Sequence, residues 1–213
     1  MTTGSANTFL GYQAGLDSDT GAATAENSVF VGWNAGAHID DGTDNIAIGA
    51  SALISSDSDD QNASYNVAIG SFALGSMNDG DNNVAIGHWA GRYNGHEGAD
   101  NNVFVGFKAG INGETDDPNG NYAANSVAVG ALSMGGNSSN DVANISGANN
   151  TCVGYDSGGQ IEGSGHSNTY IGQSAGNTGT TGVENTCIGK DADIQDATAT
   201  NQIVIGNNIT GTA

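Results

Sequence analysis

Short apolar runs alternate with longer polar stretches along the whole chain. Each run has the same form, a polar residue followed by aliphatic, small or aromatic, aliphatic and glycine, as in NNVAIG at 82–87 and NSVAVG at 125–130. Runs this short that are rich in β-branched Val and Ile are typical of strands rather than helices. We therefore predict one short strand in every run, with a turn at either end.

The runs recur 17 to 24 residues apart and can be aligned on their glycine. Eleven copies are found, at Gly11, Gly32, Gly49, Gly70, Gly87, Gly106, Gly130, Gly154, Gly172, Gly189 and Gly206. A phrase repeated at this period is the signature of a solenoid, in which every copy adds one rung. We predict a single all-β domain over residues 1–213, a parallel β-solenoid of about eleven rungs.

Each predicted strand has two columns, here called the aliphatic columns, one and three residues before the glycine, and one column between them. The first is aliphatic in every copy, and the second is Val, Ile or Thr. The intervening column is Phe9, Phe30, Ala47, Ala68, Ala85, Phe104, Ala128, Cys152, Tyr170, Cys187 and Val204. Side chains alternate across a strand, so we expect the aliphatic columns to face a narrow interior and the intervening column to line the outer wall. Eleven rungs at about 4.8 Å make this stripe on the order of 50 Å long. Such a stripe predicts self-association, which Asp at Ala68 or Ala85 should disrupt.

Three residue types at fixed places in the repeat have structural interpretations. Most copies open with an asparagine, namely Asn45, Asn66, Asn83, Asn102, Asn150, Asn168 and Asn185. We predict a ladder of amide hydrogen bonds between rungs, and we expect the glycines to allow sharp bends or positive φ. Cys152 and Cys187 lie two repeats apart in one column, about 9.6 Å, which exceeds the roughly 7 Å that a disulfide spans. We predict free, buried thiols.

Charge excludes two classes of partner. The chain has 213 residues, with 23 acidic and three basic side chains and a formal charge of −20, so nucleic acid and anionic membranes would repel it. Evenly recurring Val and Ile clusters argue against a disordered acidic chain. The sequence contains no stretch of eighteen apolar residues and no signal-peptide pattern at its start, so we expect no membrane insertion.

The repeat resembles known families. NNVAIGHWA and NSVAVGALS resemble the head repeats of trimeric autotransporter adhesins, and NTFLGYQAG and NTYIGQSAG are similar to repeats of phage tail-fibre proteins. The resemblance covers essentially the whole chain and implies a left-handed parallel β-roll assembled as a homotrimer. Adhesin-head repeats are shorter and more uniform, and we find no secretion signal, coiled-coil stalk or anchor here. We therefore expect a virion protein, with the bacterial cell surface as the alternative.

Length varies mainly in polar inserts between the strands, the largest being 111–125 and 135–149. Loops on a rigid scaffold commonly carry binding function, and Asn, Asp, Ser and Tyr side chains suit a host-surface glycan or protein. The candidate ligand-binding residues are Asn112, Glu114, Asp116, Asp117, Asn119, Tyr122, Asn137, Asn140 and Asp141. The alternative is that these inserts are solvated turns.

Two acidic clusters, SDSDD at 56–60 and NDGDNN at 78–83, offer oxygen ligands that suit Ca²⁺. The candidate metal ligands are Asp57, Asp59, Asp60, Asp79 and Asp81. The alternative is solvated acid, because neither cluster completes an EF-hand loop. Trp33, Trp89 and Tyr155 follow repeat glycines, where packing at a rung corner is favoured over ligand stacking.

No catalytic motif is found, so we do not expect an enzyme. Three functions remain: a virion fibre or receptor-binding protein that attaches to a host, a bacterial adhesin head, and a glycan-depolymerising tailspike, for which no paired carboxylates are identifiable. The edge strands of a solenoid invite association. We therefore expect one end to dock onto another virion component or onto a second copy.

Overall fold

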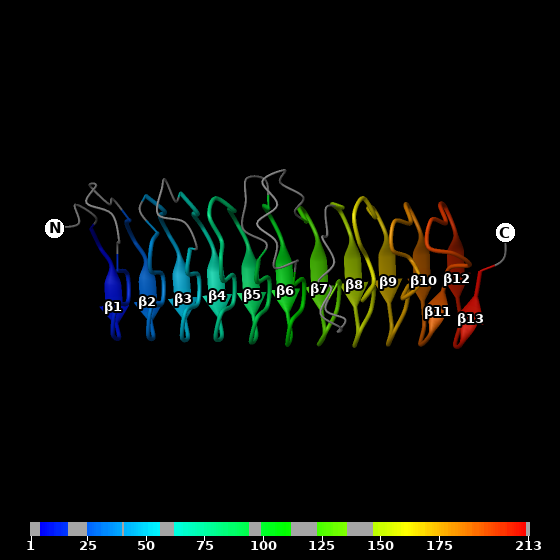
Figure 1. Cartoon of the computed structure of the whole chain (residues 1–213), viewed down its shortest axis with the longest axis horizontal. Helices are drawn as coiled ribbons and strands as arrows, with labels where there is room; N and C mark the ends of the chain where they lie inside the picture. Colours follow the sequence, from blue (N-terminus) through cyan, green and yellow to red (C-terminus); the bar gives the residue numbers. More distant parts are fainter. Residues whose placement is uncertain are drawn as a thin grey trace.

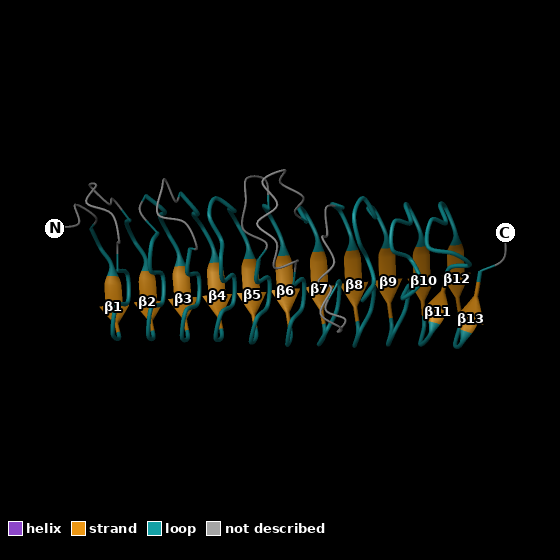
Figure 2. Cartoon of the chain, in the orientation of Figure 1, coloured by secondary structure: helices purple, strands orange, loops and turns teal. Residues whose placement is uncertain are grey.

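The computed structural model describes residues 5–16, 25–39, 41–55, 62–93, 99–111, 123–135 and 147–211. Within these ranges the protein is an all-β parallel solenoid without helices, as predicted (Figures 1 and 2). The strands of its main sheet are β1 (Thr8–Leu10), β2 (Val29–Val31), β3 (Ile46–Ile48), β4 (Val67–Ile69), β5 (Val84–Ile86), β6 (Val103–Val105), β7 (Val127–Val129), β8 (Thr151–Val153), β9 (Thr169–Ile171), β10 (Thr186–Ile188) and β12 (Ile203–Ile205).

The main sheet has eleven strands in chain order, each parallel to its neighbours. Equivalent positions of the repeat pair directly, so that Phe30 lies opposite Ala47 and Ala68 opposite Ala85. A second, two-stranded sheet pairs β11 (Ala192–Asp193) with β13 (Ile209–Thr210) beside the last strands of the main sheet (Figure 1). Because the pairing never slips, every position of the repeat forms a straight column along the long axis.

The repeat glycines and the residues after them set the turn that follows each strand. At Gly70, φ is 130° and a Cβ would lie 2.6 Å from the carbonyl oxygen of Gly87, so only glycine fits this column. Two residues later the backbone is left-handed even where the side chain is bulky, as at Phe72 and Trp89. The Trp89 N–H donates to the Ser71 carbonyl at 3.1 Å. Bonds of this kind between stacked turns offset the strain of the left-handed conformation.

The expected orientation of the strand side chains was wrong. Ala68, Ala85 and Phe104 of the intervening column are fully buried within one chain, whereas Ile48 and Ile86 of an aliphatic column are 39% and 40% exposed. The interior is too narrow for two β-branched columns, and Val and Ile instead cover the pleated outer face. Asp at Ala68 or Ala85 would therefore place a charge in the core and not at an interface between chains.

The interior is filled by two columns that compensate for each other in size. Where the strand contributes a ring, as at Phe30, the residue six positions later is glycine, and a Cβ on that Gly36 would lie 2.5 Å from ring atoms. Where the strand contributes alanine, as at Ala47, the later residue is large, Leu53. The same pairing is found at Phe104 with Gly110, Tyr170 with Gly176, Ala68 with Leu74 and Ala128 with Met134.

The predicted asparagine ladder is confirmed, with backbone groups as its main partners. The Asn66 N–H donates to the Asn45 Oδ1 at 2.9 Å, and the Asn83 N–H donates to the Asn66 Oδ1 at the same distance. The Asn66 Nδ2 also donates to the Gly80 carbonyl, at 2.8 Å. These side chains are fully buried, and the bonds satisfy polar groups that would otherwise be costly inside the solenoid.

Both cysteines are free and buried, as predicted. They lie in the interior column on either side of Tyr170, which pairs with Cys152 of β8 and with Cys187 of β10. Burial raises the pKa of the Cys152 thiol, and burial together with nearby Asp193 raises the pKa of Cys187 to about 12. The thiols are therefore protonated and unreactive as nucleophiles at neutral pH.

Candidate functional site

The outer face of the main sheet is largely apolar, with threonine at four of its twenty-two positions, and is partly open to solvent. Its side chains come from the two aliphatic columns, and exposure rises towards the ends, with Leu10 at 67% and Ile203 at 75%. The next column, one residue after each repeat glycine, extends the face with exposed rings. These are Tyr12, Trp33, Phe107 and Tyr155. We call the two aliphatic columns of β1 to β10 and β12 the outer sheet face.

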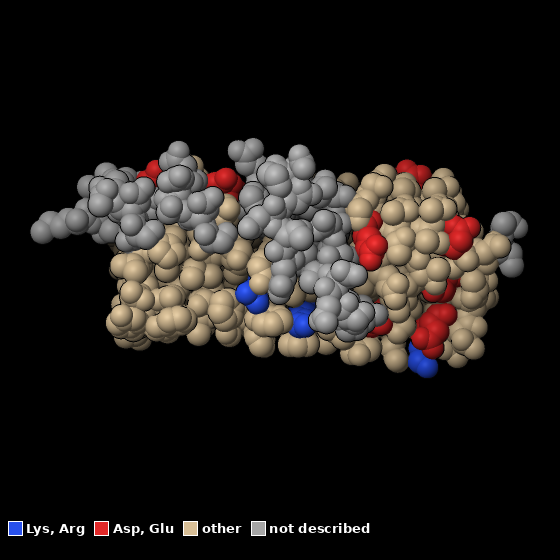
Figure 3. Space-filling view, viewed as in Figure 1, with Lys and Arg blue, Asp and Glu red and all other residues tan. Residues whose placement is uncertain are grey.

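The outer sheet face carries no charge, although the chain as a whole is strongly acidic. Every residue of the eleven main-sheet strands is uncharged. Figure 3 shows acidic side chains along the upper edge of the view and around the C-terminal strands. At about 4.8 Å per strand and 3.3 Å per residue, the outer sheet face covers on the order of 500 Å². That size is near the upper limit for an apolar patch on a monomer.

A second surface, the cation–aromatic cluster, lies on the turns that follow β4, β5 and β6. Its members are Phe72, His88, Trp89, Arg92, Tyr93, Phe107 and Lys108. The Arg92 Cζ lies 4.3 Å from the Tyr93 ring centroid and 4.8 Å from that of Trp89. The Lys108 Nζ lies 4.9 Å from the same Trp89 centroid. Two cations thus share one aromatic ring, an arrangement in which each charge is attracted to the ring face.

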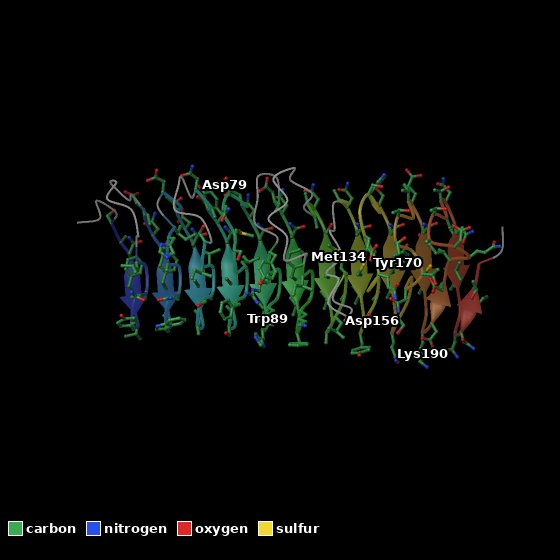
Figure 4. All side chains as sticks on the ribbon, in the orientation of Figure 1. Asp79, Trp89, Met134, Asp156, Tyr170 and Lys190 are labelled. Carbon is green, nitrogen blue, oxygen red and sulfur yellow. The ribbon has the colours of Figure 1, made fainter. Side chains whose placement is uncertain are left out.

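The stacked turns hold the cation–aromatic cluster in place. The backbone N–H of Lys108 donates to the His88 carbonyl at 3.0 Å, and that of Tyr93 donates to the Gly75 carbonyl at 2.9 Å. His88 also contacts its neighbours through its ring, with centroids 5.0 Å from Trp89 and 5.8 Å from Phe107. Figure 4 places Trp89 at the lower edge of the strands, on the same side as Lys190. The cluster is therefore built from consecutive rungs and has a fixed geometry.

The two described candidate metal ligands, Asp79 and Asp81, lie at the opposite edge, where Figure 4 labels Asp79. The Asp81 Oδ1 accepts from the Ser64 N–H at 2.7 Å, and the Asp100 Oδ1 accepts from the Asp81 N–H at 2.8 Å. Burial raises the pKa of Asp81, and the nearby Asp100 and Asp79 carboxylates raise it further. These carboxylates bind backbone groups of the preceding rung, which is a structural role.

No group of three potential metal-ligating side chains lies among the described residues. Asp57, Asp59 and Asp60 fall outside these ranges, so the calcium site stays a prediction. The candidate ligand-binding residues also lie outside the described part of the chain, namely Asn112, Glu114, Asp116, Asp117, Asn119, Tyr122, Asn137, Asn140 and Asp141. Ile111 and Ala123, the described residues on either side of 112–122, are buried. Both therefore pack on the solenoid core.

The three aromatic residues noted after repeat glycines differ in their surroundings. Trp89 packs at a rung corner, as expected, whereas Trp33 and Tyr155 are 52% and 54% exposed. Sequence reasoning did not single out Arg92 and Lys108, which are sixteen residues apart. The available signal was the repeat itself, because it stacks the turns that follow successive glycines, although Arg92 lies five residues after Gly87 and Lys108 two residues after Gly106.

No family model, curated protein or solved structure matches the chain. In the described ranges, no helix is long and apolar enough to cross a membrane. The repeat, the outer sheet face and the cation–aromatic cluster are therefore the features that bear on function.

Proposed function

We propose that the protein is a structural fibre or receptor-binding protein of a phage virion, built as a left-handed roll of about eleven rungs and assembled as a homotrimer. The uncharged, exposed outer sheet face carries this proposal, together with the resemblance of the repeats to tail-fibre repeats. In the trimer each chain covers the outer sheet face of a neighbour.

Two physical arguments support burial of the outer sheet face against copies of the same chain. The face is straight and periodic, so a second copy presents side chains at the same spacing of about 4.8 Å and can match it over the full length. It is also the part of this acidic chain that holds no charge, so copies can approach there without bringing carboxylates together. Burial of Ile48, Ile86 and their equivalents then drives assembly.

The assembly state is tested by placing charges on the outer sheet face. We expect the wild-type protein to have three times the 21.1 kDa chain mass in light scattering, and Ile48→Asp with Ile86→Asp to give folded monomers. Asn82→Asp with Asn101→Asp is the matched control, because it adds the same charge at exposed turn positions of the same region. A wild-type monomer at micromolar concentration, or a trimer that survives both charges, would contradict the proposed interface.

Attachment is assigned to the inserts 111–125 and 135–149, because length varies there while the strands stay constant. A trimer presents each insert three times and gains avidity from weak individual contacts. Replacing both inserts with the shortest inter-strand connection of the chain should leave circular dichroism unchanged and abolish attachment to host cells. Equal attachment by the shortened protein would reject this role and leave a purely structural fibre. Labelling with antibodies on imaged virions tests the location.

A further inference from the structure

We infer that the cation–aromatic cluster is a binding site for a saccharide that carries a carboxylate, such as the hexuronate units of an acidic surface polysaccharide. The inference deepens the proposed attachment function and rests on it for its biological role. It assigns a ligand class to residues outside the inserts 111–125 and 135–149. Binding itself depends only on residues that the structure describes.

The local distribution of charge points to an anionic ligand, and because the net charge of −20 disfavours densely charged polymers, this ligand carries separate carboxylates on a sugar chain. The chain has three basic residues against 23 acidic ones, and two of the three, Arg92 and Lys108, meet at one ring. The third, Lys190, is paired with its neighbour Asp191 at 3.1 Å. Among the described residues neither Arg92 nor Lys108 forms an ion pair with a carboxylate. Two cations without a carboxylate partner in the described part of the chain can bind an acid supplied from outside it.

The chemistry of the cluster favours an acidic sugar over a small inorganic ion. A guanidinium group offers a planar fork that matches a carboxylate, and Lys108 adds a second positive charge beside it. Phe107, exposed by 46%, adds aromatic surface on which the apolar C–H face of a sugar ring can pack. A bare anion would use the cations alone and leave this aromatic surface in water.

The site is also organised before a ligand arrives. The rings of Phe72, Trp89 and Tyr93 surround the Arg92 guanidinium at 4.3 to 4.8 Å and restrict its motion, so little conformational entropy remains to be lost on binding. The Arg92 Nε and the Trp89 Nε1 are buried without a hydrogen-bond partner among the described residues. Because these two atoms are covered, a carboxylate binds Arg92 through its terminal nitrogens.

The test uses purified full-length protein and oligogalacturonate, with methyl-esterified oligogalacturonate of the same length as the neutral ligand. We expect calorimetry to show binding of the free acid at least tenfold tighter than of the ester, weakening as salt is raised. Equal affinity for the two, or no binding of the acid at millimolar concentration, would overturn the inference. Equal affinity for a phosphorylated oligosaccharide would overturn the specificity for carboxylate.

Two variants locate the binding. Arg92→Gln with Lys108→Gln should lower the affinity for oligogalacturonate at least tenfold with unchanged circular dichroism, whereas Lys190→Gln, the matched control, should leave it unchanged. Unchanged affinity in the double variant would place the binding elsewhere and reject the site. Failure of the attachment proposal is seen separately, with whole cells and the shortened inserts, because this test needs neither.

Discussion

The rungs at β2 and at β3 solve the same packing problem in opposite ways. At β2 the strand contributes the ring of Phe30 and the following turn contributes Gly36, whereas at β3 the strand contributes Ala47 and the turn contributes Leu53. The interior thus has a nearly constant volume that either element can fill. In these two rungs the strand residue and the turn residue together fill about the same volume, although neither residue alone keeps its size.

Side chains from neighbouring rungs also help to fill the interior of a rung. At β5 both positions are small, Ala85 and Gly91. A Cβ on Gly91 would lie 2.6 Å from the ring of Phe104 and 2.7 Å from the side chain of Leu74, so the rungs on either side occupy this space. The unit of packing is therefore a group of about three rungs, in keeping with the nearest-neighbour coupling of solenoids.

The largest expected effect is on the free energy of unfolding, when β2 is given the small strand residue and large turn residue found at β3. A double-mutant cycle measures it. Phe30→Ala should lower the free energy of unfolding by about 3 to 5 kcal/mol by opening a cavity. Gly36→Leu should lower it by about 1 to 3 kcal/mol through overpacking against the Phe30 ring. Leu53 already has φ of 51° at the equivalent position, so the backbone accepts leucine there. The double variant should be more stable than Phe30→Ala alone, as measured by urea denaturation.

The pair Ala175→Ser and Gly36→Leu serves as the control, because Ala175 follows β9, seven strands away from β2, and shares no neighbour with Gly36, so the two effects should add. Additive losses for Phe30→Ala with Gly36→Leu would contradict the idea that the two positions share one volume.

A smaller effect, on the pH dependence of stability, is expected from the rungs at β8 to β10. Their interior column contains Cys152, Tyr170 and Cys187. Burial holds the folded pKa of Cys187 at about 12, above its usual value of 9.0. The unfolded chain therefore releases the thiol proton first, so stability is full below about pH 9 and falls as pH rises towards 12, by at most about 1.4 kcal/mol per pH unit per thiol. Cys152→Ala with Cys187→Ala should reduce this fall in urea titrations. An identical pH profile would contradict it.

Much of the fold was predictable because the repeat fixes it. The recurring glycine located every main-sheet strand, the asparagine column predicted the ladder, and the spacing of Cys152 and Cys187 predicted free thiols. The orientation of the strand side chains was not obtained, because β-branched residues suit a buried face and a pleated outer face equally well. The sequence does contain a signal for the interior column, namely that a large residue such as Phe30 is matched by a small one such as Gly36 six positions later. Only residues that share an interior volume need to match in this way.

The candidate surfaces were less predictable. The exposed apolar stripe had been assigned to the column of Ala68 and Ala85, which is buried, and the exposed apolar face is formed by the other two columns instead. Self-association stays a prediction. The cation–aromatic cluster requires contacts across three rungs, and single residues such as Arg92 give no hint of them. The predicted sites in the inserts had no repeat pattern to constrain them, since insert length and composition differ between copies.

The asparagine ladder gives the solenoid a direction of growth. Each ladder asparagine bonds towards the C-terminal side, as when the Asn168 Oδ1 accepts from the Asn185 N–H and the Asn185 Oδ1 accepts from the Gln202 N–H. A rung that forms before its successor therefore displays an open acceptor, which the next rung to be synthesised can occupy. Folding by elongation from the N-terminal side, with each rung serving as template for its successor, spares the chain a search for distant partners.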